Sequence, residues 1–201
     1  GFVIFGLVPM VVSLMLSFTN VKGSILDDFT FVGFANFAYL VKNANFLKSM
    51  RNTLFYLLNV PLSLAVGLFI AYLVNKAGTG NKFFRSVFFI PYVCSTVSIS
   101  IAWKIMYDAD YGIINTILGS FGVDKIGWIS TPQTFMLSVI IMSVWKGTGL
   151  CIILYQAALA NVNQSYYESA KIDGASPMRI FFTITLPAVS PTTFYLLTMK
   201  I

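Results

Sequence analysis

One charged side chain interrupts the longest apolar run of the sequence, which extends from Phe135 to Ala160. It is Lys146, near the centre of the run, with Trp145 before it and Gly147-Thr148-Gly149 after it. A charge at the centre of a membrane-spanning helix costs about 2.5–3.5 kcal/mol on insertion scales and therefore marks a candidate functional residue. The two glycines leave room for a neighbouring backbone or a ligand. Lys146 is thus predicted either to meet a solute or to make an ion pair or carbonyl contact within a helical bundle.

A second segment with recognisable local chemistry begins at Ser165. It reads Ser-Tyr-Tyr-Glu-Ser-Ala-Lys-Ile-Asp-Gly-Ala-Ser-Pro-Met-Arg-Ile-Phe-Phe-Thr-Ile-Thr-Leu-Pro and ends at Pro187. Ser165 and Glu168 have the spacing of a capping box, which predicts that a helix begins there. Gly174 can adopt the left-handed conformation that closes a helix, so this helix is predicted to end at Gly174.

A second short helix is predicted directly after this turn, because Ser176 can cap it and Pro177 favours its first position. Three apolar residues line up on one of its faces: Ile180, Phe181 and Ile184. Leu186 and Pro187 are predicted to end the whole segment just before the next apolar run. An isolated helix needs roughly 12 to 15 residues to be stable. The two helices are therefore expected to dock, with a groove on a partner protein as the natural candidate.

The residue types present argue against catalysis by this chain. The sequence has no histidine, which removes the commonest general base and metal ligand, and no Gly-x-x-x-x-Gly-Lys-Ser/Thr loop that could hold nucleotide phosphates. Cys94 and Cys151 lie far apart within apolar runs, so neither a disulfide framework nor a zinc site is indicated, and both are predicted to be buried, inert thiols. A membrane-embedded enzyme would need a carboxylate pair or metal ligands inside the spans, which the sequence does not supply.

These segments belong to a chain whose composition suits lipid rather than water. Of its 201 residues, 57% are hydrophobic and 10% are charged, whereas roughly 25% of residues are charged in a soluble domain. The net charge of +6 comes from basic residues dispersed among apolar runs, without the continuous stripe that indicates nucleic-acid binding. We therefore predict an all-α integral membrane protein that does not bind nucleic acid.

Five apolar runs approach the roughly 20 residues that a helix needs to cross a bilayer, and lipid favours helices because it cannot satisfy backbone polar groups. The runs are Phe2–Phe18, Thr53–Val74, Ser86–Met106, Phe135–Ala160 and one that begins near Ala188. Pro61 and Pro91 are predicted to bend the second and third runs. Together the runs predict a single polytopic domain of about five spans over residues 1–201. Because the chain begins and ends in apolar sequence, we expect a fragment cut at both ends.

The charges between these runs predict an orientation. The stretch Asn75–Arg85 carries three bases and no acid, whereas Tyr107–Thr134 carries one base and three acids. The positive-inside rule therefore places Asn75–Arg85 in the cytoplasm, together with the amino terminus and the stretch Asn161–Pro187. The outer stretch Thr19–Asn52 also holds basic residues, so the bias is local. The aromatic residues expected at the outer interface are Trp103, Tyr107 and Trp128.

The second segment also carries a family resemblance. Glu168-x-Ala170-x-x-Asp173-Gly174-Ala175, followed by Phe181 and by Ile184-x-Leu186-Pro187, closely resembles the EAA loop of permeases in binding-protein-dependent ABC importers, in the carbohydrate-uptake branch of maltose and multiple-sugar type. Supporting resemblances extend over nearly the whole chain: Gly33-x-x-Asn36-Phe37, Asn52-Thr53, Arg85 to Pro91, and Gly112-x-x-Asn115 with Trp128. Ser169 departs from the pattern, since the family has alanine there, but the change is mild.

The resemblance implies a polytopic helical bundle of the type I importer permease kind, in the inner or plasma membrane of a prokaryote. Residues 161–187 would form the cytoplasmic coupling helix in a cleft of an ATPase subunit, with Glu168 paired to a basic group and Gly174 permitting a bend. The implied partners are a second permease, like or unlike, two ATPase subunits that bind ATP and Mg, and an extracytoplasmic solute-binding protein. This chain itself would bind no cofactor or metal and would catalyse no reaction.

The resemblance also implies that the span around Lys146 holds part of the solute. Carry-over from maltose-type relatives picks out Ser143, Lys146, Gly147 and Leu150. Trp145 joins them, because an indole suits the apolar face of a sugar ring. A lysine at this place favours a solute with an anionic group, such as a uronic-acid saccharide or a phosphorylated polyol.

Two other functions stay open. One is a permease of the same family for another polar solute, such as a polyol phosphate, an acidic oligosaccharide or an amino acid. The other is an ion-driven secondary transporter or channel, which would resemble the EAA loop by coincidence and would continue to transport without ATP.

Overall fold

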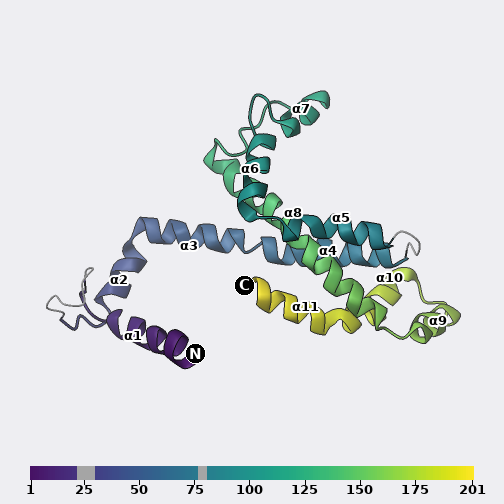
Figure 1. Cartoon of the computed structure of the whole chain (residues 1–201), viewed down its shortest axis with the longest axis horizontal. Coiled ribbons are helices and arrows are strands. Elements are labelled where there is room, and N and C mark those ends of the chain that lie inside the picture. Colours follow the sequence, from purple (N-terminus) through teal and green to yellow (C-terminus); the bar gives the residue numbers. More distant parts are fainter. Residues whose placement is uncertain (22–29, 77–80) are drawn as a thin grey trace. The chain divides into compact units, whose positions relative to one another are not determined.

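The chain is almost entirely helical in the part that the structure describes. This computed structural model describes residues 1–21, 30–76 and 81–201, with only the backbone described for residues 76 and 81–85. Helices are accompanied there by one isolated β-bridge, between Thr19 and Phe31. The all-α prediction is confirmed. The chain forms two compact units, Gly1–Leu54 and Phe55–Ile201, which are described separately (Figure 1), and the single domain over residues 1–201 stays a prediction.

The first unit is a set of short helices. It contains the π-helical turn η1 (Val3–Leu7), α1 (Val8–Leu16), α2 (Ala35–Lys42) and most of α3 (Ala44–Tyr56). The wide turn η1 precedes Pro9, whose ring and missing N–H disfavour a regular turn. The side chain of Asn36 donates hydrogen bonds of 2.9 and 2.8 Å to the carbonyl oxygens of Ser17 and Thr19. These bonds tie α2 to the end of α1.

The second unit is arranged around α8 (Pro132–Ala160). Before it come α4 (Asn59–Lys76), α5 (Asn81–Val93), α6 (Thr96–Met106) and α7 (Ile113–Ser120). After it come α9 (Gln164–Ile172), α10 (Pro177–Ile180), the π-helical turn η2 (Phe181–Thr185) and α11 (Leu186–Lys200). Figure 1 shows α6 and α7 toward one end of α8, and α9 and α10 toward the other.

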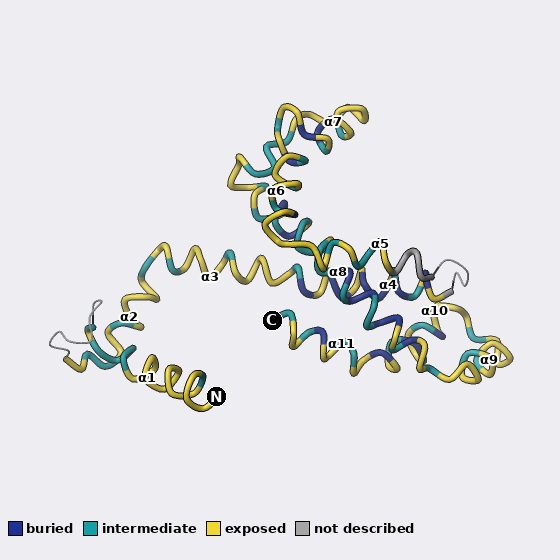
Figure 2. Tube along the Cα trace, in the orientation of Figure 1, coloured by how far each residue is buried: buried dark blue, intermediate teal, exposed yellow. Residues whose placement is uncertain are grey.

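The buried core of the second unit lies where α4, α8 and α11 pack together (Figure 2). The main contributions are Val60, Leu64, Leu68 and Ala71 from α4, and Cys151, Ile152, Tyr155 and Leu159 from α8. The two helices cross closely at Gly67, where an added Cβ would lie 2.4 Å from the Cβ of Cys151. Cys151 is buried as predicted. The predicted burial of Cys94 is wrong: it is exposed in this chain, because the run that contains it is not one continuous helix.

The apolar runs all form helices, but not all of them are long enough to cross a membrane. Those of sufficient length and hydrophobicity among the described residues are Ala44–Asn75, Pro132–Ala160 and Pro177–Lys200. The predicted span Ser86–Met106 is instead bent by 105° between α5 and α6, where Ser95 takes an extended conformation with ψ of 132°. The break follows Pro91, which was predicted to bend this run. The first run forms a shorter apolar helix, Val3–Leu16, so the figure of five spans is approximate.

The predicted orientation rests partly on residues that the structure does not describe. In the basic stretch Asn75–Arg85, residues 77–80 and the side chains of residues 76 and 81–85 lie outside the described residues. The stretches Tyr107–Thr134 and Asn161–Pro187 lie toward opposite ends of α8 (Figure 1). That arrangement is required if α8 crosses the membrane once, and the sidedness itself stays a prediction.

Candidate functional site

The segment that resembles the EAA loop forms two helices joined by a tight turn. α9 begins at Gln164, because the side chain of Asn163 caps it by accepting a hydrogen bond of 3.0 Å from the backbone N–H of Ser165. The predicted capping box of Ser165 and Glu168 is therefore wrong, since Ser165 already lies inside the helix. Glu168 is exposed in the middle of α9, where its carboxylate is free to meet a partner protein.

The turn after α9 confirms the predicted conformation of Gly174. Its φ of +73° lies in the left-handed region, which costs a residue with a side chain about 1–2 kcal/mol. This conformation lets the N–H of Gly174 bond to the carbonyl of Lys171 at 3.1 Å and the N–H of Ala175 bond to the carbonyl of Ala170 at 2.9 Å. An added Cβ on Gly174 would meet nothing within 4 Å. The backbone angle, rather than a lack of space, therefore requires glycine here.

The second helix, α10, begins as predicted but uses its apolar face differently. The hydroxyl of Ser176 accepts a hydrogen bond of 3.3 Å from the N–H of Arg179, and a proline occupies the first position. Ile180 is buried, and the ring of Phe181 packs edge-on against Tyr72 of α4 with 5.5 Å between ring centroids. Ile180 and Phe181 therefore pack against this chain, and docking of the two helices on a partner protein stays a prediction.

Leu186 and Pro187, which were predicted to end the segment before the next apolar run, do not interrupt the helix. The helix continues through η2 and α11 as far as Lys200. The N–H of Leu186 bonds to the carbonyl of Phe181 in a widened, π-helical turn. The wider turn accommodates the ring and missing N–H of Pro187 without breaking the helix. As a result, one continuous helix connects the turn at Gly174 with residues deep in the second unit.

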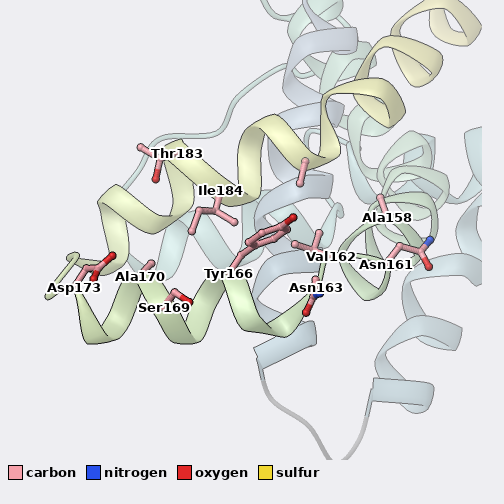
Figure 3. Close-up of a pocket in the computed structure, with 11 residues that line it drawn as sticks. Ala158, Asn161, Val162, Asn163, Tyr166, Ser169, Ala170, Asp173, Thr183 and Ile184 are labelled. Carbon is pink, nitrogen blue, oxygen red and sulfur yellow. The ribbon is translucent and has the colours of Figure 1, made fainter.

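An open groove of about 800 Å³ lies between α9 and this continuous helix. It is lined by Ala158, Asn161, Val162, Asn163, Tyr166, Ser169, Ala170, Asp173, Thr183, Ile184 and Ala188. Figure 3 shows Ser169, Ala170 and Asp173 on one side of the groove and Thr183 and Ile184 on the other. The predicted coupling residues outside its lining are Glu168, Gly174, Ala175, Leu186 and Pro187. Ile172 and Met178, on either side of the turn, expose large apolar side chains, as a docking surface would.

A cluster of polar groups surrounds one turn in the middle of α8. The ammonium of Lys146 donates a hydrogen bond to the hydroxyl of Thr96, the first residue of α6. One turn earlier, the hydroxyl of Ser143 shares a hydrogen bond of 3.0 Å with that of Tyr56. Within the part of the chain that the structure describes, the partner of Lys146 is therefore a neutral hydroxyl, and not the carboxylate or carbonyl that was one of the two expectations.

The side chain of a second lysine, Lys200, reaches the same level of α8 beside Gly147. A Cβ added to Gly147 would lie 2.5 Å from Nζ of Lys200 and 3.4 Å from Oγ of Ser63. Glycine thus leaves the space that the Lys200 side chain occupies. The residues of this cluster that sequence reasoning missed are Tyr56, Ser63, Thr96 and Lys200. Lys200 carried the same signal as Lys146, a charge within an apolar run, whereas the other three have residue types that are ordinary in membrane helices.

The turn and all of the cluster except Tyr56 fall within a stretch that matches a known protein family. Residues 63–201 match the family described as "Binding-protein-dependent transport system inner membrane component". The chain belongs to this family. The resemblance seen in the EAA-like loop is thereby confirmed, while the roles of individual residues stay predictions.

Relatives of this inner membrane component include curated proteins and a solved importer. The probable ABC transporter permease protein YesP of Bacillus subtilis is 36% identical, over 100% of this chain and 65% of its own length. The diacetylchitobiose uptake system permease protein NgcF of Streptomyces coelicolor is 33% identical, over 94% of this chain and 57% of its own. The crystal structure of the bacterial alginate ABC transporter in complex with alginate pentasaccharide-bound periplasmic protein superimposes with a TM-score of 0.82 and 26% identity, over 99% of this chain and 66% of its counterpart. The chain therefore spans two thirds or less of the length of these relatives.

Trp145 and Leu150 are also predicted to contact the solute of this inner membrane component, and they lie in different surroundings. The ring of Trp145 is about half exposed and packs edge-on against Trp103, with 5.5 Å between ring centroids. Leu150 is half-buried against the apolar core formed by α4, α8 and α11. Trp145 is therefore available to a ligand, whereas Leu150 supports the packing beside the cluster.

The weaker motif Gly112-x-x-Asn115 with Trp128 has a structural explanation in the stretch between α6 and α8. The side-chain amide of Asn115 donates hydrogen bonds to the carbonyl oxygens of Ala109 and Ile126, at 3.0 and 2.9 Å. Its Oδ1 accepts a hydrogen bond of 2.9 Å from the indole of Trp128. Asn115 therefore holds together the two arms of this stretch.

Asp108 fixes the start of the same stretch. Its carboxylate accepts hydrogen bonds of 2.9 Å from the backbone N–H groups of Tyr111 and Asp110. These two bonds, and to a smaller extent the positive charge of Lys125, hold the pKa of Asp108 below its ordinary value. Lys125 also forms an exposed ion pair of 2.9 Å with Asp110. Two of the three acids of this stretch, Asp108 and Asp110, are thus engaged in local structure.

Proposed function

We propose that this chain is a permease subunit of an ATP-driven importer and forms part of the membrane path for a sugar or sugar-like solute that an external binding protein delivers. The observation that carries the proposal is the family match, which includes all of α8 and the α9–α10 turn. The cargo class is supported by relatives that are named for diacetylchitobiose uptake and for alginate. Another polar solute of similar size is the alternative within the same family.

The α9–α10 turn is the proposed contact with a cytoplasmic ATPase. The coupling residues proposed are Glu168, Ala170, Asp173, Gly174, Ala175, Leu186 and Pro187. Exposed Glu168 and the exposed apolar side chains of Ile172 and Met178 support this role. Because α10, η2 and α11 form one continuous helix, a displacement of the turn would move Lys200 relative to α8. This provides a direct route from the ATPase to the solute path.

The solute path is proposed to pass the middle of α8. The residues proposed for it are Ser143, Trp145, Lys146, Gly147 and Leu150, with the hydroxyls of Tyr56 and Thr96 beside them. Hydroxyl and ammonium groups can bind sugar hydroxyls, and the indole of Trp145 can cover an apolar ring face. The arrangement suits a solute that has both polar edges and an apolar face.

The proposed assembly contains this chain, a second permease subunit, two ATPase subunits and the binding protein, in the inner membrane of a prokaryote. ATP and Mg are assigned to the ATPase subunits, because this sequence has no glycine-rich phosphate loop. The chain itself is proposed to be non-catalytic and to bind no cofactor.

Reconstitution of the full-length permease with its partners in liposomes tests this proposal. Uptake of the sugar carried by the binding protein should require ATP hydrolysis, and Glu168→Ala should reduce uptake and sugar-stimulated hydrolysis together. Asp124→Ala removes an exposed carboxylate of the opposite stretch and serves as the matched control for the ATPase contact. Uptake that continues without ATP under an ion gradient would overturn the proposal in favour of a secondary transporter.

A further inference from the structure

The helix α9 is attached to the rest of the second unit by few side chains. Tyr167 and Ala170 are half-buried, and the other residues of α9 are exposed. The open groove of about 800 Å³ separates one side of α9 from the continuous helix formed by α10, η2 and α11 (Figure 3). A second cavity, of about 330 Å³, is lined by Tyr167 and Lys171 of α9 and by Tyr72 of α4. Because cavities flank α9, it lies beside the other helices without close packing along its length.

Tyr167 bridges this loosely packed region. Its hydroxyl shares a hydrogen bond of 3.2 Å with the hydroxyl of Thr185 in η2, and Thr185 is completely buried. A threonine in a helix commonly bonds to the carbonyl four positions earlier. For Thr185 this is the carbonyl of Phe181, which already accepts the N–H of Leu186 in the wide turn. Because a buried hydroxyl is costly to leave without a partner, Thr185 favours the position of α9 in which Tyr167 reaches it.

Thr185 lies where the continuous helix is easiest to bend. A π-helical turn and a proline are usual causes of a kink in a helix, and η2 ends directly before Leu186 and Pro187. Thr185 is both the last residue of η2 and the residue that precedes α11. Ser176 caps the other end of this helix, roughly 13 Å away at 1.5 Å per residue. A displacement applied only at the Gly174 turn would therefore be absorbed by bending at η2 before it reached α11.

We infer that the hydrogen bond between Tyr167 and Thr185 transmits a displacement of α9 to α11, so that Tyr167 is a positioning residue for coupling. The inference rests on the proposed function and names the residue pair through which the ATPase contact acts on the membrane helices. The bond joins α9 to the point where α11 begins, so the two helices move together instead of bending apart at η2. Farther along α11, the hydroxyl of Tyr155 in α8 donates a hydrogen bond of 3.1 Å to Thr193. The displacement then acts on the contact between α11 and α8.

Hydrogen exchange measured by mass spectrometry tests this inference on the full-length permease–ATPase assembly in nanodiscs. Exchange is compared between the nucleotide-free assembly and the assembly trapped with ATP and vanadate, which requires no cargo. In the wild type, trapping should change the exchange of both α9 and residues 181–190. Tyr167→Phe should keep the change in α9 and reduce the change in residues 181–190 to less than about half. A tyrosine with a merely structural role would instead raise exchange equally in both states.

Three further variants isolate the hydrogen bond. Thr185→Val removes the other hydroxyl at nearly constant volume and should have the same effect as Tyr167→Phe. The double variant should lose no more than either single variant, because each removes the same bond. Thr185→Ser keeps the hydroxyl and should retain the wild-type change. Tyr166→Phe is the matched control, since it removes an exposed hydroxyl one position earlier in α9.

The outcomes distinguish the inference from the proposed function. A wild-type change at residues 181–190 that persists in Tyr167→Phe would overturn the inference, as would effects of the two single substitutions that add in the double variant. A wild-type response confined to α9 would support contact with the ATPase and also overturn the inference. If ATP and vanadate change exchange in neither segment of the wild-type assembly, the proposed function fails and the inference fails with it.

Discussion

The α9–α10 turn and the middle of α8 both carry charged residues, but in opposite surroundings. The turn combines both signs, Glu168, Lys171, Asp173 and Arg179, and all four side chains are exposed. The middle of α8 gathers two positive charges and no negative one, and both are half-buried. Exposed charges are solvated wherever they lie, whereas a charge in the middle of a span is costly and marks a candidate functional residue. The position of a charged residue, rather than its type, therefore decides what it indicates.

The two regions also differ in the reason why each needs a glycine. Gly174 is required by its positive φ, with open space around it. Gly149 lies in a helix, where an added Cβ would be 2.3 Å from the carbonyl oxygen of Phe88 in α5. One glycine serves backbone conformation and the other serves close packing of α8 against α5.

Gly149→Ala should have the largest effect, because the added methyl group meets backbone that cannot move aside. We expect a loss of about 2–3 kcal/mol in the free energy of unfolding, measured as a lower temperature for loss of monodisperse protein in detergent. Gly119→Ala is the control, since a Cβ there would meet nothing within 4 Å. Similar behaviour of the two variants would contradict the close packing of α5 on α8.

Lys146→Met should distinguish the role of the charge in α8 from that of the charges at the turn most clearly. Because a lysine at this place is predicted to favour an anionic solute, removing this half-buried ammonium should lower uptake of acidic saccharide about tenfold relative to neutral saccharide. Lys171→Met in α9 removes the same charge and should leave the ratio of acidic to neutral uptake unchanged, even if total uptake falls. The comparison fails if both variants change this ratio equally in transport assays with radiolabelled sugars.

Gly174→Ala tests the turn through backbone conformation alone. Alanine in the left-handed region costs about 1–2 kcal/mol, so the turn should shift and sugar-stimulated ATP hydrolysis should decrease while basal hydrolysis persists. Gly174→Asn should retain more stimulation, because asparagine tolerates this region better than alanine does. Stimulation that is equal in Gly174→Ala and wild type would show that coupling does not depend on this turn.

Asn163→Ala should have a smaller, local effect, because it removes the cap of α9. The expected cost is about 1 kcal/mol, seen as faster hydrogen exchange of the backbone amides in the first turn of α9. Ser165→Ala should leave exchange nearly unchanged, since its hydroxyl does not cap the helix. The reverse result would restore the capping box that the sequence suggested.

The smallest effect is expected at Asp108, where the pKa in the folded protein is lowered by the hydrogen bonds from Tyr111 and Asp110. Its contribution to stability is therefore present above the ordinary carboxyl pKa of about 4 and is lost as the pH falls through the lowered value. Carboxyl NMR of labelled aspartate should show a titration midpoint for Asp108 below the ordinary carboxyl value of about 4. A midpoint at or above the ordinary value would indicate that the turn is not formed in solution.

Local chemistry predicted the turn better than it predicted the ends of the helices around it. Gly174 and Ser176 were identified correctly, because a left-handed turn and a serine cap depend on residues within a few positions. The start of α9 was misplaced, since Asn163 and Ser165 are both good caps and only one is used. The continuation past Pro187 was missed, because a widened turn can accommodate a proline that would break a regular helix.

The sequence by itself determined that this protein is surrounded by lipid rather than water. It also determined the apolar runs, the turn at Gly174 and the absence of acidic residues from the spans. These follow from composition and from residues close together in the chain. Only the tertiary structure decided which groups surround Lys146. Thr96 is 50 positions away, Tyr56 is 87 positions from Ser143, and Lys200 approaches through the space left by Gly147. Such contacts depend on how helices cross and where α5 and α6 break, and neither property is encoded in the apolar periodicity of a single run.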